Sequence, residues 1–303
     1  LLNGKNQNYI SSYLDAAIEG NPYPLCANVD NAFRGMDVLG MGFTLSEEIA
    51  KQLIKEDPRN VEILFPFING KDLYTNVDQS ASRWVIYFHD WPLSRNGEGI
   101  WSNASKTQKS KWLAIGIVPK DYPGKVAEDY PECMEIVKKY VYPERQKNRN
   151  KKRREIWWRF DRPRIELYNT LKSVSRVLAI ALTSKTAAVV FVPSIQVFSH
   201  ATGVFTYTGY TSFSIMQSNF HFEWAWKYGS SLKGDLRYTP SSVFQTFPFP
   251  TENDNNIKEL ATIGEMYHEH RRQIMLTQQE GLTKTYNRFH NPEETSEDIA
   301  QLR

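Results

Sequence analysis

The feature that most constrains the fold is a block of three closely spaced runs rich in β-branched and aromatic residues, at 176–182, 187–192 and 196–207. Runs of this composition, separated by a few residues, are typical of neighbouring strands. Apolar residues at helical spacing occur on both sides of the block. The sequence therefore predicts an α+β fold, with a curved mixed or antiparallel sheet, peripheral helices and a C-terminal helical segment.

Local signals place the helices. Thr44-Leu45-Ser46-Glu47 fits a capping box ahead of a helix that Asp57-Pro58 ends. Pro131 opens a second helix, which continues into a basic run with a kink at Pro143. Two more helices are predicted at 210–228 and 257–279, and the glycines at 229 and 281 mark their ends.

The remaining segments are predicted to be strands and loops. Short strands are predicted at 64–67, 84–88 and 242–247. The polar segment 96–108 is predicted to be a flexible loop. Residues 1–45 are predicted to be extended segments and turns, because Asn21-Pro22-Tyr23-Pro24 blocks regular structure.

Positive charge is concentrated in one segment. The 303 residues include 37 Lys and Arg and 34 Asp and Glu, a net charge of +3. Residues 138–164 hold twelve of the basic residues and three acids, which gives this segment +9 and leaves −6 for the rest. Phosphate is the commonest partner of such a segment, although a solvated helix face or a hinge has the same composition. Trp157 and Trp158 follow; they suit nucleic-acid stacking or an inward-facing helix anchor.

Sequence signatures of catalysis are missing. The glycines of 35–42 lack the strand–turn–helix context of a cofactor-binding loop and are interpreted as tight turns. Asn21-Pro22-Tyr23-Pro24 has the wrong order for the Asn-Pro-Pro-aromatic loop of amino-methylating enzymes. No histidine has zinc-like spacing, and His268 and His270 would point about 200° apart on a helix. Two cysteines are too few for a four-ligand zinc site. We therefore expect no catalytic residue, metal or cofactor in this chain.

Charged side chains that could form hydrogen bonds with DNA bases are concentrated between residues 232 and 239. If this segment is extended, Lys233, Asp235 and Arg237 project from the same side. Lys or Arg donates to guanine O6 and N7, and Asp accepts from cytosine N4, so such a pair reads both halves of a G·C pair. The alternative is a Lys–Asp–Arg salt-bridge cluster on the surface.

Five stretches of the chain resemble one known family. They are GSSLKGDLRYTP at 229–240, FQTFPFP at 244–250, VLGMGF at 38–43, LFPFINGKDL at 64–73 and GLTKTYNRFH at 281–290. Together they resemble the target-recognition region of MmeI-type (type IIL) restriction–modification enzymes and of related large bacterial adenine-specific DNA methyltransferases.

The resemblance implies a division of labour between domains. It implies that a methyltransferase domain of the same parent chain, with the S-adenosylmethionine fold, precedes this chain, which is expected to be a fragment because it begins at Leu1. Residues 1–45 would lead in from that domain, 46–250 would form the target-recognition domain and 251–303 the C-terminal helical segment. The fragment, non-catalytic itself, would bind double-stranded DNA while the missing domain methylates adenine N6. Whether the parent also cleaves DNA stays open.

The resemblance also implies site residues. Base-reading side chains would lie on the segment of Lys233, Asp235 and Arg237, with another contact near His200 and Ala201. Phosphate contacts from the basic segment would position the duplex. The residues predicted to make them are Arg149, Lys151, Lys152, Arg153, Arg154 and Arg159.

Two other classes of function stay open. One is a glycan-binding or hydrolase-associated module that uses the 8 Trp, 16 Tyr and 16 Phe as stacking platforms. The other is a structural domain whose basic run docks an acidic protein. The longest apolar stretch, at 177–193, is interrupted by polar residues, so no membrane span is expected, and the low cysteine content favours the cytoplasm.

Overall fold

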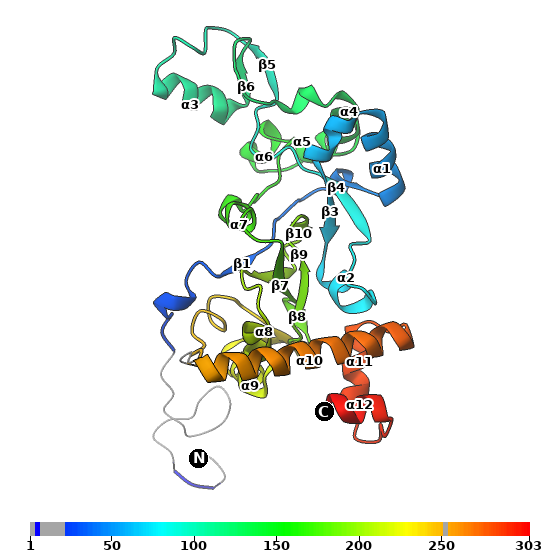
Figure 1. Cartoon of the computed structure of the whole chain (residues 1–303). Coiled ribbons are helices and arrows are strands. Elements are labelled where there is room, and N and C mark those ends of the chain that lie inside the picture. Colours follow the sequence, from blue (N-terminus) through cyan, green and yellow to red (C-terminus); the bar gives the residue numbers. More distant parts are fainter. Residues whose placement is uncertain (1–3, 7–21, 251–253) are drawn as a thin grey trace.

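Figure 1 shows the computed structural model of the chain, which describes residues 4–6, 22–250 and 254–303. Asn21, the first residue of the proline-containing turn, lies outside the described residues. Helices surround mixed and antiparallel sheets, and helices follow at the C-terminal end. The predicted α+β class is therefore confirmed, although the strands are distributed over several small sheets.

The predicted apolar block forms the centre of an antiparallel sheet. Its strand order is β1-β11-β7-β9, made of Ala32–Arg34, Thr202–Phe205, Arg176–Ala181 and Val190–Pro193. Consecutive residues of β7, from Val177 to Ile180, are fully buried. Burial without alternation means that both faces of this sheet are covered. Leu178, Phe205 and Phe213 belong to the same hydrophobic cluster.

A second, mixed sheet has its own core. Its order is β10-β3-β4-β2, made of Val197–Phe198, Leu64–Ile68, Arg83–Ile86 and Thr44–Leu45. β10 pairs with β3 in parallel, and the other pairs are antiparallel. Since β10 and β11 are consecutive, the chain passes from one sheet to the other through residues 199–201.

Helices cover the two sheets at opposite ends of the molecule (Figure 1). On the side of the second sheet lie α1 Glu47–Glu56, α4 Pro131–Tyr140, α5 Tyr142–Gln146 and α6 Lys151–Glu155. α2 Gly70–Thr75 and α7 Ile165–Leu171 lie between the ends. At the other end are α8 Tyr210–Gln217, α9 Asn219–Tyr228, α10 Asp254–Gln278, α11 Leu282–Phe289 and α12 Glu297–Leu302. None of the helices in the described ranges is long and apolar enough to cross a membrane.

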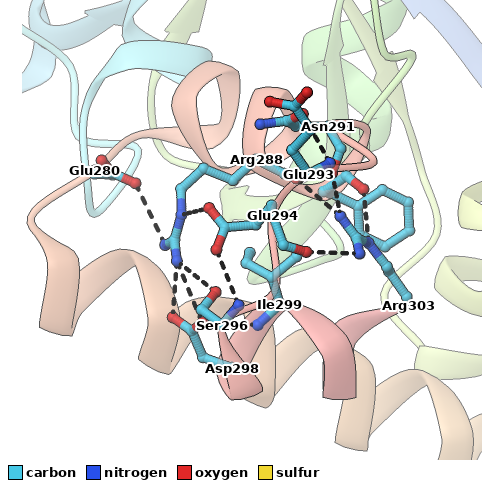
Figure 2. Close-up of polar contacts among 10 residues, drawn as sticks. Glu280, Arg288, Asn291, Glu293, Glu294, Ser296, Asp298, Ile299 and Arg303 are labelled. Atoms are coloured by element: carbon cyan, nitrogen blue, oxygen red, sulfur yellow. Dashed lines mark hydrogen bonds and ion pairs between the residues drawn. The ribbon is translucent and has the colours of Figure 1, made fainter.

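Two arginines connect α11 and α12 through ion pairs and hydrogen bonds (Figure 2). Arg288 on α11 forms ion pairs with Glu280, Glu294 and Asp298, at 3.7, 3.0 and 3.2 Å. Arg303 donates to backbone carbonyls of the α11–α12 connection, including that of Asn291 at 2.6 Å. α12 is therefore held by charge as well as by its buried Ile299 and Leu302.

A small α/β unit projects from the upper end of the molecule as drawn in Figure 1. It consists of β5 Ser94–Gly97, α3 Lys106–Ile115 and β6 Ile117–Pro119, and β5 pairs with β6 in parallel. The predicted loop at 96–108 is thus wrong at both ends: its first two residues belong to β5, and α3 begins after the Ser105 cap. α3 has no buried residue, so it lacks the apolar periodicity that reveals a helix in sequence.

The strand predicted at 242–247 is also wrong, because this segment forms successive turns. Val243 N–H donates to Thr239 C=O at 2.9 Å, and Gln245 N–H to Pro240 C=O at 3.0 Å. The Asn28 amide donates to the carbonyls of Phe244 and Phe247, at 3.0 and 2.8 Å. A side chain more than 200 residues away thus takes the place of a neighbouring strand.

Helix boundaries differ from prediction in three places. Ser46 caps α1, and its hydroxyl oxygen accepts from Ile49 N–H, whereas the Thr44 hydroxyl donates to Met41 C=O. The helix predicted at 210–228 is two helices that meet at Ser218. α10 ends at Gln278, and Gly281 caps the start of α11.

Candidate nucleic-acid interface

The predicted base-reading segment is a β-hairpin. β12 Ser230–Leu232 pairs antiparallel with β13 Asp235–Arg237, and Lys233 and Gly234 form the two-residue turn. Their φ angles are +52° and +86°, as a type I′ turn requires at both central positions. Lys233 therefore sits at the hairpin tip, and the predicted extended alternation of three side chains holds only for Asp235 and Arg237.

The base of the hairpin is anchored in the core. Leu236 is buried and opposes Ser184 of β8 Thr183–Ser184, the third strand of this small sheet. Tyr238 is buried, and its hydroxyl lies 3.0 Å from Nε2 of His221. The His221 Nδ1 lies 2.7 Å from Met216 C=O, and burial lowers the pKa of His221 to about 4. A neutral, buried imidazole thus holds the residue next to Arg237.

The recognition side chains of the hairpin are available to a partner. Lys233 and Arg237 are exposed, and Asp235 is partly exposed. Within the described residues, none of these three side chains forms an ion pair or side-chain hydrogen bond. The salt-bridge cluster considered as an alternative is therefore not formed there.

The turn at His200 and Ala201 lies next to the hairpin base. Leu182 joins the two segments: its N–H donates to Ala201 C=O at 2.9 Å, and its C=O accepts from Tyr238 N–H at 2.8 Å. His200 is exposed, and its backbone C=O accepts from Arg34 Nε at 2.7 Å. The fold thus brings together two predicted base-reading segments that are more than 30 residues apart in the chain.

Some cations of the basic segment are bound to groups within the protein, and others are exposed to solvent. Arg153 binds Asp161 through two hydrogen bonds, at 2.6 and 2.8 Å, and these hold the pKa of Asp161 below its ordinary value. Arg154 donates to the carbonyls of Asn148 and Arg149, at 2.7 and 3.0 Å. The Nε of Arg159 donates to Trp91 C=O at 2.9 Å. Each of these three arginines, all predicted to contact phosphate, thus makes at least one hydrogen bond within the protein.

The other three predicted phosphate contacts, Arg149, Lys151 and Lys152, are exposed. Lys151 lies 3.6 Å from Glu155, one turn away on α6, an exposed pair of little energetic weight. Trp157 and Trp158 are buried, with the Trp158 indole N–H donating to Trp91 C=O at 3.0 Å. The tryptophans are therefore inward-facing anchors.

Asp37 connects the basic segment to the His200 turn. Its backbone C=O accepts from Asp161 N–H at 2.9 Å and from Arg162 N–H at 3.2 Å. Its carboxylate lies 3.6 Å from Arg162 Nε and 3.4 Å from His200 Nδ1. Neither Asp37 nor Arg34 was predicted to matter, and only the fold places them beside residues more than 120 positions later. The basic segment, the His200 turn and the hairpin base are thus joined by direct contacts.

The site holds the groups of a recognition surface: forked donors, a carboxylate acceptor and free ammonium groups. Within the described residues, no group of three or more His, Cys, Asp or Glu side chains could hold a metal ion. A cavity of about 510 Å³ is lined in part by the aromatic residues Tyr87, His89 and Tyr168. None of the predicted site residues lines that cavity.

Comparison with known proteins bears on this arrangement. Residues 123–251 match the family model described as "MmeI, target recognition domain". All eleven predicted contact residues fall within this range. The predicted resemblance is confirmed for this segment.

Over almost the whole chain, the fold is similar to that of a solved structure. A solved structure titled "Structure of Type IIL restriction-modification enzyme MmeI in complex with DNA has implications for engineering of new specificities" is similar with a TM-score of 0.65 and 17% sequence identity. The match covers 98% of this chain and 34% of that chain. This chain thus spans about one third of the MmeI chain. Comparison with curated proteins gives no match.

Proposed function

We propose that this chain is the DNA target-recognition module of an MmeI-type restriction–modification enzyme. The observation that carries the proposal is the family match over 123–251, which includes an anchored hairpin with unpaired Lys, Asp and Arg side chains. The partner is double-stranded DNA. Methylation of adenine N6 from S-adenosylmethionine would belong to a methyltransferase domain of the same parent chain.

The hairpin would read bases in the major groove. Asp235 and Arg237 share one face of β13, because residues two apart on a strand point the same way. Arg237 would donate to guanine O6 and N7 while Asp235 accepts from cytosine N4, so that the pair reads one G·C base pair. Lys233 at the tip, and the His200–Ala201 turn beside the base, would contact the neighbouring base pairs.

The exposed cations would position the duplex without reading it. Arg149, Lys151 and Lys152 are free to approach phosphates, whereas Arg153 and Arg154 would act first by holding the segment in place. A cytoplasmic location is part of this proposal; the free thiols of Cys26 and Cys133 are compatible with a reducing compartment.

Binding of the chain to random duplex DNA, followed by selection and sequencing, tests the proposal. We expect one enriched motif and an affinity that falls steeply with salt. Lys152→Ala should weaken binding to all duplexes alike and reduce the salt slope by about one, whereas Lys284→Ala, on the exposed face of α11, should change neither. Salt-insensitive binding to glycans without DNA binding would favour the aromatic-module alternative.

A further inference from the structure

A cavity of about 400 Å³ lies beside the basic segment, between α3, α5, α6 and the loop that follows α6. Its charged lining residues are the cations Arg145, Lys152, Arg153 and Arg159 and the acids Asp90 and Asp161. Arg153 and Asp161 neutralise one another. Three cations therefore remain against the single carboxylate of Asp90.

Arg145 is a buried cation without a carboxylate partner among the described residues. The residue is 3% exposed. Its Nη2 donates to the backbone carbonyls of Val38 and Arg159, at 3.0 and 3.2 Å, and its Nε is buried without an acceptor. Burial lowers the pKa of this guanidinium.

Arg159, like Arg145, is largely buried and has an unpaired guanidinium nitrogen. Its side chain is 12% exposed, and Nη1 lies 4.0 Å from Asp90, whose own side chain is half exposed. Nη2 is buried without an acceptor. The side chain of Arg145 donates to the backbone carbonyl of Arg159, and both residues line the same cavity. A buried guanidinium group with an unpaired N–H is unfavourable unless an anion accepts from it.

We propose that this cavity is a phosphate-binding pocket. Arg145, Arg159 and Lys152 all line the cavity, so an oxyanion inside it would be close to three cationic residues. Unlike the exposed Lys152, Arg145 and Arg159 are largely buried, and backbone carbonyls hold their guanidinium groups before any ligand arrives. We assign the phosphate to the DNA backbone, an assignment that rests on the proposed function. Binding of a backbone phosphate here would fix the position of the hairpin along the duplex.

The test uses inorganic phosphate and duplex DNA on the 303-residue chain. Phosphate at constant ionic strength, replaced by chloride in the control, should raise the midpoint of thermal unfolding and should compete with DNA. Arg159→Gln should abolish the phosphate-specific shift and weaken binding to every duplex by about tenfold. Arg159→Lys should recover part of both effects. Arg272→Gln, an exposed arginine on α10, should behave like wild type.

Lys152→Gln keeps the test decisive if Arg159→Gln fails to fold, since Lys152 is exposed; it should weaken the phosphate effect in part. Equal shifts in phosphate and chloride would overturn the pocket. A phosphate shift lost in Arg159→Gln, with DNA affinity unchanged, would support the pocket but overturn its assignment to DNA in favour of a free phosphate. A phosphate shift without any DNA binding would leave the pocket standing and refute the proposed function.

Discussion

Replacing Arg237 by Ala isolates base reading from stability. The side chain is exposed and forms no ion pair or hydrogen bond with another described side chain, whereas the hairpin is held by Leu236, Tyr238 and the pairing with β8. The free energy of unfolding should therefore change by less than about 0.5 kcal/mol. Affinity for the selected duplex should fall by about 1–3 kcal/mol, or roughly 5- to 150-fold, since one bidentate base contact is lost.

The assay is fluorescence anisotropy on the selected duplex and on duplexes that each carry one substituted base pair. Wild type should discriminate at every position of the motif, and Arg237→Ala should lose discrimination at one position only. If Asp235 reads the same base pair, the double variant should lose less than the sum of the single losses. An equal loss on all duplexes would refute base reading by Arg237 and indicate a phosphate contact.

Three further predictions concern the parts that hold the interface. Gly234→Ala should cost about 1 kcal/mol of unfolding free energy, measured in urea, because φ is +86° there, although a Cβ would meet no other atom within 4 Å. Tyr238→Phe leaves the buried His221 Nε2 without its partner and should cost about 1–3 kcal/mol, whereas Tyr23→Phe, on an exposed ring, should cost nothing measurable. Hydrogen bonds from Ser296 and Arg288 lower the pKa of Glu294 from 4.5 to about 2, so the stabilisation is present above pH 4.5 and is lost as the pH falls towards 2. The protection of the α12 amides, which is their hydrogen-exchange rate relative to the intrinsic rate at the same pH, should fall over that range. Unchanged protection would contradict the stabilising role of the contacts in Figure 2.

The elements that sequence predicts well are those whose own residues decide them. The strands β7, β9 and β11 come from runs so apolar that only a covered sheet accommodates them. α4 begins at Pro131, where a missing N–H costs nothing. The turn at 242–247 could not be foreseen, because its carbonyls are bound by Asn28.

The candidate site was foreseen in part. The residue types of the hairpin were recognised, but the segment was predicted to be extended throughout, although a Lys-Gly pair between two short strands also fits a two-residue turn. The links through Asp37 and Leu182 depend on long-range backbone contacts. Arg145 and Arg159 have unpaired guanidinium nitrogens only because the fold buries both side chains. The composition therefore shows a basic segment, and only the fold shows which of its cations lack a partner.

The central claim is that this chain chooses the DNA sequence on which a larger enzyme acts. The most direct measurement is sequencing of methylated DNA from cells that express the complete enzyme with Arg237→Ala or Lys233→Ala. We predict that methylation persists and that the methylated site becomes degenerate at one base pair for each variant. An unchanged methylated site in both variants would contradict the account.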